Sequence, residues 1–208
     1  AERLGLGRTP VREALKGLAR EGLLDVVPMR GTFLRQPSID DVREIYEVRL
    51  AIEGMATCLV AERGPPPELR AFRGRLAAFL DRDDPAAIEQ MDRAGWEFHD
   101  AIVAATGNRR MRQMYEALRL PIMALRSGRP VGAARARQSL AEHLAILAAI
   151  EAGDAALAQR RMTEHLAGVL EARVRLPTQA ALPSPAPDAP SPTARTGAPP
   201  GSARRRRG

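Results

Sequence analysis

Aromatic residues make up only 3 % of this 208-residue sequence, although hydrophobic residues make up 45 %. Alanine and leucine supply most of the apolar volume, and both favour helices over strands. A core built from such side chains forms by packing helix on helix, so the sequence predicts a mainly α protein and argues against an all-β sandwich. The length suits one or two domains.

The sequence contains no run of 18 apolar residues, and its first residues lack the charged and then apolar pattern of a signal peptide. The single cysteine, Cys58, cannot form an internal disulfide, which is typical of proteins in a reducing compartment. We therefore expect a cytoplasmic protein without a membrane partner.

Basic residues are distributed unevenly along the chain. Residues 1–36 carry a net charge of +3, residues 37–176 are neutral, and residues 177–208 carry +4. The last segment holds eight of the 17 prolines and no aromatic residue, and it ends in four consecutive arginines. It cannot bury enough apolar surface to offset the entropy of ordering, so we expect a disordered tail. Its arginines are either solvated or contact phosphates nonspecifically.

The first segment has the pattern of a helix end at residues 2–4, a turn, a second helix and a two-stranded wing. Thr9 is a suitable N-cap and Pro10 a suitable first residue for the second helix, which Gly22 would end. Apolar side chains recur along one side of this helix and basic side chains along another. Two short β-prone runs on either side of a turn predict the wing.

The amino-terminal end of the second helix carries groups that a DNA-recognition helix uses. The guanidinium groups of Arg8 and Arg12 and the hydroxyl of Thr9 can contact base edges and phosphates in the major groove. Arg30, beside Gly31 in the predicted wing turn, can reach an adjacent groove or phosphate. A basic stripe on a helix is also common on solvated surfaces, so the residues alone leave both interpretations open.

A family resemblance favours DNA binding. Residues 1–15, with the block Arg-Thr-Pro-x-Arg-Glu-Ala-Leu, and the later Arg30-Gly31 pair resemble the winged helix-turn-helix of GntR-family bacterial regulators. The resemblance implies that the three helix residues named above contact an operator in double-stranded DNA and that Arg30 and Gly31 lie in the wing. It also implies that the family's first helix is missing from this sequence, so we expect the apolar stripe of the second helix to be partly uncovered.

Residues 37–176 are expected to form six helices with no strands between them, and hence an antiparallel bundle. Ser38 and Asp84 are the predicted N-caps of the first and third helices, and Pro121 is expected to kink the fourth. The predicted helices span about 39–63, 67–81, 85–107, 108–127, 132–151 and 154–175.

All three histidines of the chain, His99, His143 and His165, fall on predicted helices of this bundle. Scattered helical histidines are more often surface or hydrogen-bonded residues than metal ligands. Here each lies among apolar neighbours on a face expected to turn inward. Three neutral imidazoles would suit Zn²⁺, Ni²⁺ or a related divalent ion, so we predict a three-histidine metal site.

Residues 38–172 resemble the FadR C-terminal (FCD) effector domain. The resemblance rests on the run 40–49 with Glu53, and on Phe98-His99, Gly107-Asn108, residues 139–143 and residues 164–166. It implies an effector-binding domain in which one aspartate and three histidines hold a divalent metal, with small carboxylates bound at the metal.

The three histidines carry over from the family's ligand set, but the aspartate does not. Its position, one turn before His99, is Gly95 here. Asp92 lies about 10 Å along the helix axis from His99, too far to replace the aspartate, and Glu97 and Asp100 point away from the His99 face. We therefore expect a three-histidine site with an extra position open to water or effector.

The resemblance also implies a role for Arg49, because the family's matching arginine lies on the cavity-facing first helix of the domain. It can pair with an effector carboxylate. The alternative is an ion pair with Glu53, one turn later in the same helix.

The favoured function is a homodimeric, ligand-responsive transcription regulator, in which a small carboxylate at the metal cavity changes the operator affinity of two winged domains. One alternative is an effector-binding or dimerising module that has lost DNA binding. The other is a three-histidine metalloenzyme, which the sequence disfavours. The motif His-Glu-x-x-His is absent, and Glu142 and Glu164 point about 100° away from the histidines that follow them.

Overall fold

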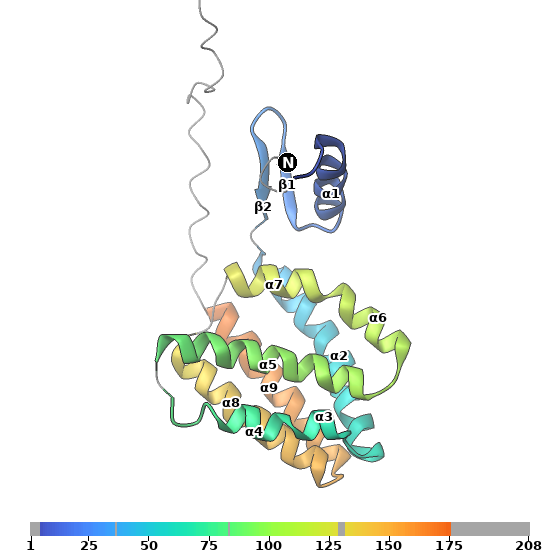
Figure 1. Cartoon of the computed structure of the whole chain (residues 1–208), viewed down its shortest axis with the longest axis vertical. Coiled ribbons are helices and arrows are strands. Elements are labelled where there is room, and N and C mark those ends of the chain that lie inside the picture. The colour runs from blue at the N-terminus through green and yellow to red at the C-terminus, as the bar shows by residue number, and fades with distance from the viewer. Residues whose placement is uncertain (1–4, 36, 83, 129–131, 176–208) are drawn as a thin grey trace, which may run out of the picture.

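The computed structural model describes residues 5–35, 37–82, 84–128 and 132–175. Over these residues the chain forms two parts, a small winged unit and a larger helical bundle (Figure 1). The tail expected at 177–208 and the helix end expected before Gly5 lie outside the described residues.

The winged unit consists of one helix and two antiparallel strands, namely α1 (Arg8–Arg20), β1 (Leu24–Val27) and β2 (Gly31–Leu34). Leu24 of β1 lies opposite Leu34 of β2. The unit buries little apolar surface, because α1 has no buried residue and Leu15 on its apolar stripe is 37 % exposed. The helix and wing predicted from the sequence are confirmed, and the stripe is partly uncovered as expected.

The start of α1 differs from the prediction. The N-cap is Gly7, which has no side chain to accept a hydrogen bond, so the prediction of Thr9 as N-cap is wrong. The first four N–H groups of any helix lack an intrahelical acceptor, so Pro10 fits the third position as well as the first. The helix can therefore begin two residues earlier. Gly22 follows the helix with a left-handed φ of 73°, as predicted.

The remaining helices form the bundle, and the prediction of a mainly α architecture is confirmed. Within the described residues, two of the six predicted helices are each divided into two shorter helices. The bundle helices are α2 (Ile39–Arg63), α3 (Pro67–Arg70), α4 (Phe72–Ala77), α5 (Pro85–Ala105), α6 (Arg109–Ala117), α7 (Arg119–Gly128), α8 (Ala133–Glu151) and α9 (Ala155–Arg175).

Pro121 explains one of the two splits. A proline has no N–H to bond the carbonyl four residues before it, and its ring collides with that carbonyl. The carbonyl concerned belongs to Ala117, which is the last residue of α6. The chain therefore ends one helix and begins another at Arg119, so that Pro121 sits in the first turn of α7. The kink predicted at Pro121 is therefore a break between two separate helices.

Both predicted N-caps of the bundle are present. The Ser38 hydroxyl accepts a hydrogen bond from the backbone N–H of Asp41 at 3.0 Å, and the Asp41 carboxylate accepts one from the Ser38 N–H at 2.8 Å. This reciprocal arrangement is a capping box. At α5 the Asp84 carboxylate accepts a hydrogen bond from Ala87 N–H, and Pro85 occupies the first helical position.

The core lies among α2, α5, α8 and α9, and α3 and α4 lie along one side of it (Figure 1). Its largest buried side chains include Tyr46, Phe98, Leu147 and Met162. Because these four helices share one core, side chains that point inward from α5, α8 and α9 meet each other. Within the described residues, no helix is both long and apolar enough to cross a membrane.

The capping box of α2 gives a first prediction. Changing Ser38 to alanine removes the side-chain acceptor and leaves the Asp41 N–H without its partner. We expect the free energy of unfolding, measured by urea denaturation, to fall by about 1 kcal/mol. Ser38→Thr keeps a hydroxyl and should lose less than about half of that amount. An alanine variant as stable as the parent protein would contradict the cap.

Candidate metal centre and nucleic-acid interface

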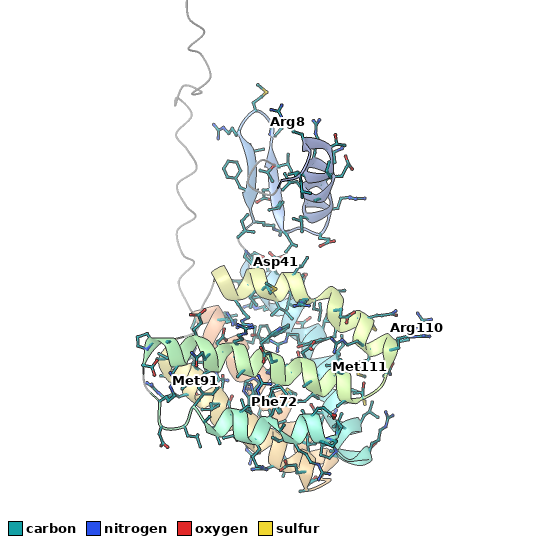
Figure 2. The ribbon with its side chains drawn as sticks, in the orientation of Figure 1. Arg8, Asp41, Phe72, Met91, Arg110 and Met111 are labelled. Carbon is teal, nitrogen blue, oxygen red and sulfur yellow. The ribbon has the colours of Figure 1, made fainter. Side chains whose placement is uncertain are left out.

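The five residues predicted to contact DNA are all exposed in the winged unit. Arg8 and Thr9 lie in the first turn of α1, and Arg12 lies one turn later. Figure 2 shows Arg8 at the end of the unit farthest from the bundle, and Figure 1 shows the turn between β1 and β2 at that same end. The start of α1 and the wing therefore face the same way, away from the bundle.

The wing turn differs slightly from the prediction. The N–H of Arg30 donates to the carbonyl of Val27 at 3.1 Å, which closes a β-turn with Pro28 and Met29 at its two central positions. Met29 is fully exposed and has a positive φ of 61°, where glycine is usual. The tip is thus Pro28-Met29, and Arg30 is the cation directly after it.

The three histidines predicted as metal ligands come together in the core of the bundle. His99 is supplied by α5, His143 by α8 and His165 by α9, and all three are buried. Their Nε2 atoms lie 3.1 Å apart for His99 and His143, and 3.2 Å apart for the other two pairs. Within the described residues this is the group of potential ligands that could hold a metal ion.

These distances fit a metal ion. Nitrogen ligands at roughly 2.1 Å from one ion are about 3.0 Å apart when their bonds are at right angles and about 3.4 Å apart at the tetrahedral angle. The observed separations of 3.1 to 3.2 Å lie between the two limits. Three imidazoles on one side of an ion would leave coordination positions for other ligands.

Two carboxylates hold the outer nitrogens of these rings. Glu53 Oε2 lies 2.5 Å from His99 Nδ1, and Glu142 Oε2 lies 2.6 Å from His165 Nδ1. Burial would raise the pKa of Glu53, but the charge of Arg49 and the contact with His99 lower it to about 2. Burial likewise opposes the hydrogen bonds that lower the pKa of Glu142 to about 2.

The protonation of the site follows from these two carboxylates. At neutral pH both are ionised and can only accept hydrogen bonds, so we assign the ring proton of His165, which bonds Glu142, to Nδ1. Burial lowers the pKa of His165 to about 4, and burial and the neighbouring histidines lower the pKa of His143 well below 6.5. The lowered pKa values keep His143 and His165 neutral at pH 7, and a neutral imidazole is the form that binds a divalent cation.

The position of the missing aspartate is filled. A Cβ placed on Gly95 would lie 2.6 Å from Cε1 of His143, so the His143 ring occupies the space where a side chain at position 95 would begin. Asp92 does not approach the histidines as a ligand, as its distance from His99 along the helix axis predicted. It pairs with Arg126 instead. Glu97 pairs with Arg75 and Arg93 on the exposed side of α5, away from His99.

A cavity of about 60 Å³ is lined by all three histidines. This volume is enough for roughly four water molecules or a small polar ligand. Three arginines, Arg49, Arg126 and Arg173, also line it, and Asp92 is the carboxylate among its lining residues. Buried Arg173 donates from Nε to the hydroxyl of Tyr46 at 3.1 Å. The cavity wall is therefore suited to an anion.

Arg49 forms the ion pair with Glu53 that the sequence left as an alternative to effector binding. Its Nε and Nη2 lie 2.5 and 3.3 Å from the two carboxylate oxygens, and the side chains are 5 % and 0 % exposed. Breaking a buried pair of this kind costs about 3–5 kcal/mol. Arg49 can therefore meet a ligand in the cavity only while it stays bound to Glu53.

Arg126 is held more loosely than Arg49. It pairs with Asp92 through Nε at 3.1 Å and through Nη2, and the two side chains are 23 % and 41 % exposed. Partly exposed ion pairs contribute about 0–1 kcal/mol, so Asp92 is an exchangeable partner.

Sequence reasoning missed the residues that support the histidines. The sequence predicted Glu53 only as an ion-pair partner of Arg49. It predicted that Glu142 points away from His143, and so gave it no role at the site. Arg135, which donates two hydrogen bonds to Glu142 at 3.0 and 2.7 Å, was not considered. The contacts of Glu53 with His99 and of Glu142 with His165 each join two helices, so no spacing within one helix could have predicted them, whereas Arg135 and Glu142 lie two turns apart on α8.

Comparisons with known proteins agree with both parts of the chain. Residues 1–34 match the model of the family described as bacterial regulatory proteins, gntR family, and residues 44–168 match the FCD domain. The sequence is 32 % identical over 174 residues to the probable D-xylose utilization operon transcriptional repressor of Paenarthrobacter nicotinovorans. The match covers 83 % of this chain and 75 % of that protein.

Two solved structures share the fold. McbR/YncC of E. coli aligns with a TM-score of 0.62 and 24 % identity, over 82 % of this chain and 83 % of that one. A metal-free FCD domain of a transcriptional regulator aligns with a TM-score of 0.56 and 22 % identity, over 66 % of this chain and 94 % of that one. At these identities the structures establish the fold alone.

The buried histidines give a prediction for the metal-free protein. The folded-state pKa of His165 is about 4, whereas an unfolded histidine titrates near 6.5. Between these values the unfolded state binds more protons, so stability falls as the pH is lowered from about 6.5 to about 4. We expect the free energy of unfolding in urea with EDTA to be about 2 kcal/mol lower at pH 5 than at pH 7 through His165 alone.

The control for this experiment is His165→Gln, which removes the titrating ring. Its stability should change less between pH 7 and pH 5 than that of the parent protein. An unfolding free energy independent of pH over this range in the parent protein would contradict a buried neutral His165.

Proposed function

The chain belongs to the GntR family of bacterial regulatory proteins and carries an FCD domain, and from this premise we propose that its operator affinity is set by a small carboxylate bound at a metal ion in the bundle. Members of this family are transcription regulators that bind DNA, and the chain is accordingly a DNA-binding regulator and not an enzyme.

The observation that carries the metal proposal is the convergence of three Nε2 atoms within 3.2 Å of one another in a buried site. Two of the rings are oriented from behind by carboxylates, which is the usual support of metal-binding histidines. We infer that His99, His143 and His165 hold Zn²⁺ or Ni²⁺, which would supply positive charge and exchangeable positions for a carboxylate.

The effector proposal is supported by the charges around the cavity. Three arginines line it together with the histidines, and Arg49 and Arg126 pair with carboxylates through only part of their donors. An arginine has five N–H donors, so Arg49 and Arg126 can each offer some to a bound anion. Arg49 remains a proposed effector contact in its pair with Glu53.

The DNA side of the proposal is supported by the exposed end of the winged unit. Arg8, Thr9 and Arg12 at the start of α1 would contact the major groove, and Arg30 with Gly31 in the wing would contact an adjacent groove or phosphates. We further propose a homodimer, because the outer face of α2 carries uncovered apolar side chains seven residues apart at Val48 and Met55.

Metal analysis tests the first part of the proposal. We expect the purified full chain to carry about one divalent ion per chain, and His143→Ala to lose most of it, because two of three imidazoles bind far more weakly than three. Inductively coupled plasma mass spectrometry gives the metal content, and native mass spectrometry gives the mass of the dimer. Glu164→Gln, at an exposed position next to His165, serves as the matched control. Equal metal content in the His143 variant and the parent would refute the site.

DNA binding is tested with variants along α1. Arg8→Ala and Arg12→Ala should each weaken binding to a duplex from upstream of the protein's own gene by about 5- to 150-fold, which corresponds to about 1–3 kcal/mol. Arg20→Ala, an exposed arginine in the last turn of the same helix, should have a small effect. Fluorescence anisotropy at a fixed salt concentration measures the affinities. Equal losses in all three variants would argue against recognition by the first turn of α1.

A further inference from the structure

Arg126 occupies a position that no other arginine of the cavity shares. Together with Trp96 it lines both the three-histidine cavity and a second, outer pocket on the bundle surface, which also includes Arg93, Arg119 and Met123. The Arg126 guanidinium lies 5.8 Å from the centre of the Trp96 ring. These two side chains therefore border both the three-histidine cavity and the outer pocket, whose lining also includes Glu97 and Asp100.

The exchange of partners is easier for Arg126 than for Arg49. Arg49 is held by a fully buried carboxylate, and Arg173 is buried and bonded to Tyr46. Arg126 pairs with a partly exposed carboxylate, Asp92, on the rim of the same cavity. A carboxylate entering the cavity competes with Asp92 for the same guanidinium.

The helix that carries Arg126 also reaches the winged unit. Ile122 and Arg126, one turn apart on α7, line the three-histidine cavity. Pro121 and Ala124 of the same helix line a groove of about 190 Å³ whose other wall includes Leu23 of the winged unit. Figure 1 shows α7 at the end of the bundle that faces the winged unit, beside the start of α2.

The groove also contains the connection between the two parts. Arg35, directly after β2, pairs with Asp41 in the first turn of α2 at 3.1 Å. Both residues line the groove together with Pro37. A shift of α7 therefore changes the surroundings of the ion pair that ties the end of the wing to the start of the bundle.

We propose that Arg126 is the effector-sensing residue: a carboxylate bound in the three-histidine cavity takes the Arg126 guanidinium from Asp92, and α7 carries this exchange to the groove against the winged unit. The inference rests on the proposed function, because it requires an anion in that cavity. It assigns direct recognition to Arg126, with Arg49 fixed in place by Glu53.

Trp96 provides the readout, since it is the only tryptophan of the sequence and lies beside Arg126. The zinc-loaded full chain is titrated with acetate, L-lactate, L-malate and citrate by calorimetry and by tryptophan fluorescence. For the carboxylate that the parent protein binds, Arg126→Ala should lower the affinity at least 10-fold and abolish the fluorescence change at saturation. Asp92→Asn removes the competitor and should raise the affinity at least 3-fold.

Arg110→Ala is the matched control, because Arg110 is an exposed arginine that points away from the bundle on α6 (Figure 2). It should bind like the parent protein. Hydrogen exchange followed by mass spectrometry tests the second step. At saturating carboxylate, exchange should change in peptides covering 119–128 and 35–45 in the parent and in the control, but not in Arg126→Ala.

The possible failures are distinguishable. If the zinc-loaded parent binds none of the four carboxylates, both the proposed function and this inference are wrong. If the parent binds one of them and Arg126→Ala binds it equally tightly, only the role of Arg126 is refuted. If Arg126→Ala at saturation still changes the exchange of residues 35–45 as the parent does, the transmission through Arg126 and α7 is refuted.

Discussion

The buried ion pair of Arg49 and Glu53 is the interaction on which the arrangement of the site depends. One carboxylate accepts from Arg49 of the same helix and contacts Nδ1 of His99 on a neighbouring helix. It thereby neutralises a buried cation and fixes which nitrogen of His99 faces the cavity. Removing Glu53 would leave Arg49 buried without a counter-charge and His99 without its orienting partner, so folding and ligand geometry depend on the same group.

Local signals in the sequence predicted the helices well, because a cap or a glycine acts within a few residues. The box at Ser38 and the Asp84-Pro85 pair lie where they were expected. The start of α1 was misplaced, since Pro10 is compatible with several positions in a first turn. The helix break was also misjudged, because Pro121 acts on the carbonyl of Ala117, four residues earlier.

The candidate site was predictable only in part, because its ligands come from three helices. The apolar surroundings of each histidine predicted that it points inward, and the bundle geometry brought the three together. Glu142 shows the limit of such reasoning. It does point away from His143, as the helix period requires, and for that reason it faces α9 and bonds His165. The sequence also could not predict that the space beside Gly95 is filled, since the His143 ring that fills it comes from another helix.

Pro121 connects the local sequence to the proposed regulation. A continuous helix over residues 109–128 would join Arg126 rigidly to Arg112, which pairs with Asp100 of α5. The break after α6 makes α7 a separate helix of ten residues, held to α5 at its far end by the pair of Arg126 and Asp92. A short helix whose described polar contact with α5 is exchangeable can shift as a unit when that contact is replaced. Pro121, by interrupting the helix, thus allows the side of α7 that lines the three-histidine cavity and the side that lines the groove to move together.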